Sequence, residues 1–382
     1  MSALRGGGRP HIVLIGAGHA HLYLMRHRHR LADADITIVD PGAFWYSGMA
    51  AGMLGGAHDP AEIRSDPRRL ARQYGLDSVR GRLVGLDRAG RQAQLADGRT
   101  LGYDLISLSL GSCAPTPSAA SHGPGVWAVK PIAQLVALRH YLSNAFERGE
   151  RPALVVVGGG ASGVELACNL RSLATRHAAQ IAITLVSRSR KLIPTAPSGA
   201  RRWLEGYLRR IGVEVRVGMR AVSQHRDGLL IAEEGATMGQ DALRLLECGH
   251  VIHASGLAPP DTLGGLGLTF IDGRGLALHD TLQSVDDPDV FAAGDCAALV
   301  AHALPRLGVY GVRQAPVLLA NLEARLHGRP LQRYRPQAQA LTILDLGHGQ
   351  GLAIRGRLWW AGRSSLLWKR WLDDRFMADY RQ

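Results

Sequence analysis

The sequence predicts an α/β fold in which two similar units of parallel strands and helices precede a shorter C-terminal α/β tail. An apolar, largely β-branched run at 11–15 passes directly into closely spaced glycines and then into a helical pattern. The same order recurs from residue 153, and a later apolar run closes each unit. Continuous apolar runs of this length are typical of strands buried on both faces of a parallel sheet.

The first unit has the pattern of a Rossmann-like dinucleotide-binding domain. A glycine turn between a strand and a helix lets the backbone approach a pyrophosphate, which the helix N-terminus then stabilises. The next strand, at 36–40, ends in a carboxylate at roughly the spacing of a ribose-binding acid. The residues predicted to bind nucleotide here are Gly16, Ala17, Gly18, His19 and Asp40.

The second unit carries a complete GxGxxG motif at Gly158, Gly160 and Gly163, between a strand at 153–157 and a helix from residue 164. Two such units in one chain indicate a flavin nucleotide on one and a nicotinamide nucleotide on the other. The strand at 181–186 leads to Arg188 and Arg190 rather than to an acid. Cations there favour the 2′-phosphate of NADPH, although a plain basic loop also fits the pattern.

Length and composition predict a multidomain cytoplasmic protein. A chain of 382 residues is too long for one ordinary core, and its first ten residues lack an apolar signal sequence. The net charge is +13, which fits a solvated basic surface or attraction to nucleotides or an anionic membrane. No motif predicts nucleic-acid binding, and the four cysteines form no CxxC pair.

We divide the chain at residues 1–128, 129–258, 259–335 and 336–382, because composition and turn signals change there. The first and third segments are expected to form one domain, the second the other, and the fourth an interface or membrane-associating tail. Residues 41–56 mix glycines with aromatic residues, which suits either a chain lying against a flat ligand or a surface loop. Residues 59–74 are expected to be helical, and residues 78–100 to form a small antiparallel sheet.

The tail ends in an amphipathic helix, predicted over 365–381. Two interpretations fit it: the helix docks its apolar face on the body or on a second subunit, or it lies on a membrane, where tryptophan and arginine favour the interface. The residues assigned to the apolar face are Leu367, Trp368, Trp371, Leu372 and Phe376.

The ordered motifs resemble those of the pyridine nucleotide-disulfide oxidoreductase superfamily, the flavoproteins with two dinucleotide-binding domains. Within it, the chain looks closer to type II NADH dehydrogenases and sulfide:quinone oxidoreductases than to disulfide reductases, whose CxxxxC motif is missing. The segments 18–21, 46–49 and 309–314 also resemble the oxidoreductase domain found fused to selenide, water dikinase. The motifs that carry the resemblance are the two glycine fingerprints, Asp40, Gly111-Ser112, Ala254-Ser-Gly256 and Ala293-Gly-Asp295.

The resemblance implies FAD on the first unit and NAD(P)H on the second, with hydride passing to the flavin. Glu165 resembles the family's glutamate near the nicotinamide, although a glutamate favoured by the helix dipole fits equally. His21 replaces the third glycine of the first fingerprint, so its imidazole is expected to fill the gap or to touch FAD. Glu165 and Gln314 are the residues expected to take part in catalysis, with Gln314 bordering the flavin ring. Further residues expected at the flavin are Tyr46, Ser47, Gly48, Met49, Gly111, Ser112, Gly294 and Asp295.

A quinone is the first choice of electron acceptor, because the resemblance and the Trp-bearing tail both favour it. A sulfur or selenium compound is the alternative, with Cys113, Cys248 or Cys296 as the reacting thiol. A third hypothesis is a redox-sensing module that holds FAD with little turnover. We expect no metal, because the histidines at 19, 21, 27 and 29 spread around a helix axis. Peripheral contact with the inner face of the membrane and homodimerisation are compatible with the sequence.

Overall fold

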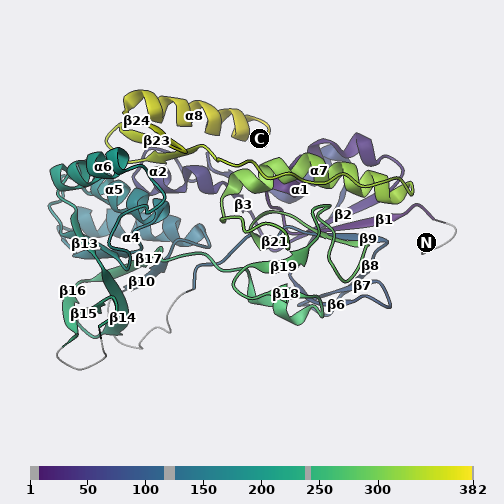
Figure 1. The fold of residues 1–382 in the computed structure, drawn as a ribbon, viewed down its shortest axis with the longest axis horizontal. Coiled ribbons are helices and arrows are strands. Elements are labelled where there is room, and N and C mark those ends of the chain that lie inside the picture. Colours follow the sequence, from purple (N-terminus) through teal and green to yellow (C-terminus); the bar gives the residue numbers. More distant parts are fainter. Residues whose placement is uncertain (1–7, 116–124, 237–241, 381–382) are drawn as a thin grey trace.

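The computed structural model describes residues 8–115, 125–236 and 242–380 (Figure 1). Two five-stranded parallel sheets form the two nucleotide-binding domains, and a small α/β tail lies across them. The predicted α/β class with two Rossmann-like domains is therefore confirmed. The turn signal predicted at 123–124 lies outside the described residues.

The first sheet has the strand order β20-β9-β1-β2-β5, and the helices α1 and α7 pack together on it. Strand β20 comes from the third segment of the chain and pairs with β9 of the first segment, so the two segments share one sheet, as expected. All its pairings are parallel, so the carboxyl ends of its strands meet at one edge. The elements are β1 (His11–Ile15), β2 (Asp35–Asp40), β5 (Asp77–Arg80), β9 (Leu105–Leu108), β20 (Val290–Ala292), α1 (His19–Arg26) and α7 (Gly308–Leu326).

The second sheet has the strand order β10-β17-β11-β12-β13, and α5 packs against it. Its edge strand β10 pairs with β17 from Gly125 onward, so our boundary after residue 128 was a few residues too late. The elements are β10 (Gly125–Ala128), β11 (Leu154–Val157), β12 (Ile183–Ser187), β13 (Glu214–Val217), β17 (His250–His253), α4 (Ala133–Glu147), α5 (Ala161–Arg176) and α6 (Ser198–Arg210).

Two local predictions were wrong. The helix expected over 59–74 is α3 (Pro67–Tyr74) alone, because Asp66 is extended before a proline and caps the Arg68 amide. Residues 41–56 are not all loop, since they contain β3 (Phe44–Trp45) and α2 (Ala50–Leu54). The antiparallel sheet expected over 78–100 is confirmed in part, as β6 (Leu83–Asp87), β7 (Gln92–Leu95) and β8 (Thr100–Gly102). Residues 78–80 instead belong to β5, which pairs parallel with β2.

Outside the tail, the described residues form three further small sheets. One lies in the second domain, one beside the first sheet, and β3 pairs with β4. Their strands are β4 (Arg64–Ser65), β14 (Met219–His225), β15 (Gly228–Glu233), β16 (Arg244–Glu247), β18 (Phe270–Ile271), β19 (Gly275–Leu278) and β21 (Ala297–Leu299).

The tail is an antiparallel sheet covered by one helix, which lies along one side of the molecule in Figure 1. Its elements are β22 (Thr342–Asp345), β23 (Gly351–Arg355), β24 (Leu358–Gly362) and α8 (Arg363–Ala378). The apolar face of α8 does not dock on the body of the chain: Leu367 and Trp371 are 64% and 55% exposed, whereas Lys369 and Asp373 are buried. The reason is that the site beneath α8 supplies partners for a buried lysine and aspartate. Of the five residues assigned to that face, Phe376 packs against the core. A second subunit and a membrane remain the predicted occupants of the face.

The His21 side chain fills the space between α1 and the first sheet. A glycine at this position would let the helix and the sheet pack directly against each other. His21 is fully buried; its Nδ1 lies 2.5 Å from the Gly16 carbonyl oxygen and its Nε2 lies 2.9 Å from the Ser107 hydroxyl. A neutral imidazole satisfies both contacts, donating to the carbonyl and accepting from the hydroxyl. Burial lowers the pKa of His21 to about 4, so the neutral form prevails at neutral pH. The first of our two expectations for His21 is confirmed.

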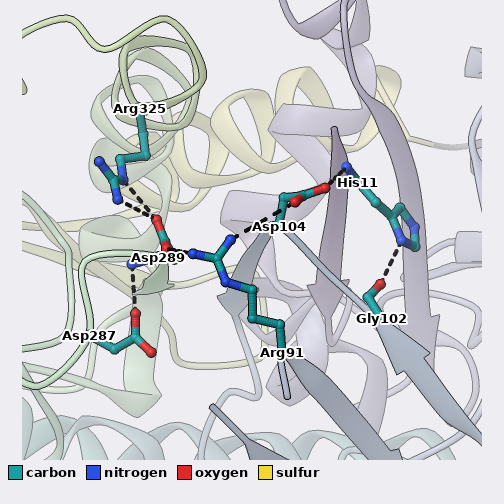
Figure 2. Close-up of polar contacts among 7 residues, drawn as sticks. All are labelled: His11, Arg91, Gly102, Asp104, Asp287, Asp289 and Arg325. Carbon is teal, nitrogen blue, oxygen red and sulfur yellow. Dashed lines mark hydrogen bonds and ion pairs between the residues drawn. The ribbon is translucent and has the colours of Figure 1, made fainter. Parts of the chain in front are cut away.

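A buried ion cluster ties together the amino ends of the strands of the first sheet (Figure 2). Asp289 accepts from Arg91 Nη2 at 2.7 Å and from Arg325 Nε at 2.8 Å. Arg91 also lies 3.9 Å from Asp104, whose other oxygen accepts from the His11 amide. Because these residues come from both parts of the discontinuous domain, the cluster fastens the late strand to the early ones.

We predict that Asp289→Asn lowers the free energy of unfolding by about 3 kcal/mol, because it removes the buried charge that two half-buried arginines share. Urea denaturation of the flavin-saturated protein measures this change. Asp97→Asn, which disrupts the exposed Asp97–Arg99 pair, is the matched control and should change stability little. Equal, small effects of both variants would show that the cluster does not stabilise the fold.

We also predict that acid destabilises the protein partly through His21. Its folded pKa lies below its unfolded value, so its contribution is complete above pH 6.5 and is lost as the pH falls toward 4. Between about pH 7 and about pH 5 the loss is about 2 kcal/mol. His21→Asn removes the titrating group, so the stability of this variant should fall less steeply with acid. The exposed His29→Asn is the control, and identical slopes in all three proteins would contradict the assignment.

Candidate functional site

The β1–α1 turn forms a cradle that only glycine fits. Gly16 has φ +84°, and a Cβ there would lie 2.5 Å from the Ser109 carbonyl oxygen. A Cβ on Gly18 would lie 2.3 Å from the Ser109 hydroxyl. The close approach of β9 to this turn therefore requires both glycines, and the α1 N-terminus faces the same space.

Asp40 stands at the carboxyl end of β2, as predicted. Its carboxylate accepts the Ala17 amide at 2.7 Å and the Gly42 amide at 2.8 Å. Burial raises the pKa of Asp40, and the two amide hydrogen bonds oppose that rise. The acid is thus fixed beside the glycine turn, where a ribose attached to the cradled pyrophosphate is expected.

A cavity of about 620 Å³ runs along this edge of the first sheet. Its size suits a large cofactor, and the glycine cradle and Asp40 provide the contacts that the ADP half of FAD requires. The residues present therefore fit FAD. The predicted residues that line the cavity are Gly16, Ala17, Gly18, His19, Asp40, Ser47, Gly111, Ser112, Gly294 and Asp295.

Four residues expected at the flavin make other contacts. Gln314 accepts the Gly294 amide at 2.7 Å, so it positions the Gly294–Asp295 turn, and Met49 is buried in the core. Tyr46 and Gly48 contact α8, as described below. The sequence analysis missed Gly308 and Gly311, one turn earlier on α7, which do line the cavity.

Lys130 is a functional residue that sequence reasoning missed, because it stands beside Pro131 at a position we took for a boundary. It lines the cavity and donates to Asp295 at 3.0 Å and to the Ser112 hydroxyl at 2.7 Å. Ser112 in turn donates to Asp295 at 2.6 Å. Burial alone would raise the pKa of Asp295, but the Lys130 charge and these hydrogen bonds hold it below its ordinary value. Asp295 is therefore a fixed acceptor facing the cavity.

The second cradle repeats the first at the β11–α5 turn. Gly158 has φ +133°, and a Cβ on it would lie 2.3 Å from the Ala254 carbonyl oxygen. A Cβ on Gly163 would lie 1.8 Å from the Gly158 carbonyl oxygen, so helix and strand pack too closely for any other residue. Gly160 faces open space, as a residue next to a pyrophosphate should. The exposed Arg188 and Arg190 follow β12 nearby.

A buried polar cluster, made by Tyr46, Glu165, Asp345, Lys369 and Asp373, joins both domains to the tail. Lys369 Nζ donates to Asp373 at 2.8 Å and to the Gly48 carbonyl at 2.6 Å, while the Tyr46 hydroxyl donates to Asp373 at 2.9 Å. Glu165, on α5, accepts the Asp345 amide at 2.7 Å. The 46–49 loop, α5 and α8 are thus connected by charged and polar side chains in the interior.

Burial and neighbouring charges in this cluster bring the pKa of one acid close to neutral pH. Burial raises the pKa of Glu165 to about 7, against the opposing charge of Lys369. Burial disfavours the charge on Lys369, but the carboxylates of Asp373 and Glu165 outweigh it and raise the pKa of the ammonium group. Glu165 can therefore gain and lose a proton at physiological pH beside a cation that stays charged.

Two of the three cysteines named in our alternative hypothesis are poor nucleophiles here. All four cysteines are unpaired, and burial raises the pKa of Cys248 and of Cys296 to about 11. Cys113 lines the flavin cavity and contacts the Ala258 carbonyl. Within the described residues, no group of three or more His, Cys, Asp or Glu side chains could hold a metal ion.

Comparisons with known proteins agree with this geometry. The chain is 25% identical over 285 residues to ferroptosis suppressor protein 1 of Taeniopygia guttata, which covers 72% of this chain and 71% of the relative. It is 26% identical over 199 residues to the type II NADH:quinone oxidoreductase of Haemophilus influenzae, covering 48% and 42%. The fold matches NDH2 from Plasmodium falciparum in complex with NADH with a TM-score of 0.83 at 13% identity, over 98% of this chain and 96% of that one.

Residues 10–317 match the pyridine nucleotide-disulphide oxidoreductase family. This match spans both glycine cradles and the late strand that completes the first sheet. The chain belongs to the pyridine nucleotide-disulphide oxidoreductase family, and it is an oxidoreductase that uses FAD and NAD(P)H.

Proposed function

We propose that the protein oxidises NAD(P)H and reduces a quinone, with FAD carrying the electrons between them. The buried cluster around Glu165 and Lys369 is the observation that carries this proposal. A quinone takes up two electrons and two protons, whereas NAD(P)H supplies two electrons and one proton as hydride. The second proton must come from solvent through the protein, so a quinone reductase needs a proton-carrying group near the flavin.

Glu165 is our candidate for that group. Its pKa of about 7 lets it release a proton and recover it at neutral pH, which is the condition for an effective general acid. Lys369 donates to the Gly48 carbonyl in the 46–49 loop. Tyr46, in the same loop, and Lys369 both donate to Asp373. Bound FAD accepts hydride from NAD(P)H and passes the electrons on. The chain's part is to hold both nucleotides and to supply the remaining proton.

The relatives support the quinone over the other acceptors. One of them is a type II NADH:quinone oxidoreductase by name. A sulfur or selenium route is less favoured, because two of its three candidate thiols have raised pKa values. We also propose NADPH as the preferred donor, because Arg188 and Arg190 stand where an acid would select NADH. If the protein binds flavin but does not turn over NAD(P)H, the hypothesis of a redox-sensing module is the one that holds.

We predict that Glu165→Gln slows electron transfer to a water-soluble quinone about a hundredfold, because it removes the titrating acid. Stopped-flow spectra separate this step from bleaching of the flavin by NADPH or NADH, which should change little. The wild-type quinone step should also follow a pKa near 7 that the variant lacks. Glu205→Gln, on the exposed side of α6, is the control.

Two outcomes would contradict this proposal. If Glu165→Gln reduces quinone at the wild-type rate and keeps the same pH profile, the proton does not pass through Glu165. If the wild-type protein consumes neither NADPH nor NADH with any quinone, despite a flavin spectrum, the redox-sensing hypothesis replaces it.

The quinone proposal also suggests where the protein meets its substrate. We define the tail patch as the exposed apolar side chains of β24 and α8. Trp360 and Trp368 stack at 5.2 Å within it, and Arg375 lies over the Trp371 ring. No helix among the described residues is long and apolar enough to span a bilayer. The residues of the patch are Leu358, Trp360, Leu367, Trp368, Trp371 and Leu372.

We propose that the tail patch rests on the inner face of an anionic membrane, with the rest of the protein in the cytoplasm. Tryptophan and arginine favour the bilayer interface, and the net charge of +13 attracts anionic lipid. A membrane also holds the quinone. A second copy of the chain is the competing occupant, since a homodimer could cover the same apolar surface.

We predict that Leu367→Glu with Trp371→Glu reduces binding to phosphatidylglycerol vesicles about tenfold, because two charges enter the apolar surface. Co-sedimentation measures binding, and Val300→Glu, at an exposed valine outside the tail, is the control. Substitution is preferable to removal of α8, which would also remove buried Lys369. The tail patch would be assigned to homodimerisation instead if the wild-type protein does not bind vesicles and forms a dimer that the double substitution dissociates.

A further inference from the structure

A second cavity, of about 280 Å³, lies away from both nucleotide cradles. It is lined by residues of the carboxyl-terminal half of α5, the end of β22, the turn between β22 and β23, and α8, and by Ala57, which follows α2. The α5 helix meets the nicotinamide nucleotide at its other end, where the glycine motif stands. The proposed electron-transfer reaction makes no use of this cavity.

Donors gather on one part of its wall. Arg176 and Arg370 both line the cavity, and within residues 8–115, 125–236 and 242–380 neither has an ion-pair partner. The Arg370 Nε is buried without a hydrogen-bond partner in the same set of residues. A buried guanidinium donor without a partner costs free energy that a bound anion would recover.

Acceptors gather on another part of the wall. Asn169 is fully buried, and its Nδ2 donates to the carbonyls of Glu165 at 3.0 Å and Asp345 at 2.9 Å. Because both partners are acceptors, the orientation of the amide is fixed and Oδ1 is the remaining atom. That Oδ1 is buried and has no donor among the described residues. The Asp345 carboxylate lines the same cavity.

The two halves of the wall define the ligand. The arginines require negative charge, whereas Asn169 Oδ1 and Asp345 require a hydrogen-bond donor and would repel a second anion. His348, also in the wall, has its pKa lowered by burial and by the neighbouring Arg171 and Arg176, so it adds no fixed charge at neutral pH. An ion such as sulfate satisfies only the arginines, and a neutral polyol satisfies only the acceptors.

We propose that this cavity binds a small phosphate monoester of a polyol, with the phosphate at Arg176 and Arg370 and a hydroxyl donating to Asn169. The volume of about 280 Å³ admits such a molecule and is too small for a dinucleotide. The site is connected to the buried cluster, because the Asp345 amide donates to Glu165 at 2.7 Å. The inference does not depend on the quinone being the acceptor.

Calorimetry on the flavin-loaded protein, saturated with oxidised nicotinamide nucleotide, tests the proposal with both cradles filled. Glycerol 3-phosphate is the probe, and inorganic sulfate and glycerol are the comparison ligands. We expect saturable binding of the probe and at least about tenfold weaker binding of each comparison ligand. Arg176→Gln and Arg370→Gln should each weaken the probe about tenfold, while Arg202→Gln on the exposed side of α6 should not.

Three results would overturn the inference. They are the absence of saturable heat with glycerol 3-phosphate, unchanged affinity in both arginine variants, and sulfate binding as tight as the probe. The last result would mean a simple anion site without the hydroxyl contact. Thermal melting of each variant confirms that the fold is retained, and the two arginine variants test the cavity independently from α5 and α8. Failure of quinone reduction leaves these measurements unaffected, so the two proposals can fail separately.

Discussion

The arrangement of the tail depends on one constraint: a lysine buried in the protein interior must be paired. Lys369 points from α8 toward the 46–49 loop, where the Gly48 carbonyl accepts a hydrogen bond from it, and Asp373, one turn further along the same helix, neutralises its charge. Removing one partner from such a pair leaves a buried charge, at a cost of about 3 to 5 kcal/mol. Rotation of the helix about its axis, or sliding along the body, would break the hydrogen bonds that join Lys369 to Gly48 and Asp373 to Tyr46. The same interaction fixes the 46–49 loop, because Tyr46 shares Asp373 with the lysine.

This constraint explains why the apolar residues of α8 face outward. Hydrophobicity alone favours an orientation that buries Leu367, Trp368, Trp371 and Leu372, which was one of the interpretations that the sequence left open. The observed helix buries Lys369 and Asp373 and leaves the large apolar side chains at the surface. An exposed apolar surface of this kind indicates a partner or a membrane. The buried charges thus specify the orientation, and the orientation creates the surface that the proposed function needs.

The parts of the fold that the sequence predicts are those with local causes. Both glycine cradles, the parallel strands and the helices α4 to α7 follow from apolar periodicity and from turns that only glycine can make. The parts it missed depend on contacts between distant segments. Lys130 reaches Asp295 across 165 positions, and Tyr46 reaches Asp373 across 327. Glu165 was named from a resemblance, but its environment required the tail to be folded over it. A polar residue on a helix gives no local sign of the charge it will meet.

The two cradles and the buried cluster together suggest how the tail can couple binding to chemistry. Helix α5 carries the nicotinamide cradle at its N-terminus, Glu165 in its second turn, and Asn169 one turn further on. The Asn169 amide holds the carbonyls of Glu165 and Asp345, and the Asp345 amide holds the Glu165 carboxylate. A shift of β22 would therefore change the hydrogen bonding of Glu165, and with it the pKa that the proposed proton transfer requires. Because the second cavity is lined by Asp345 and Asn169, a ligand there would act on the same hydrogen bonds. Under the proposed function the tail is then a third structural element of the active site, since it would set the protonation of an acid that belongs to the nicotinamide domain.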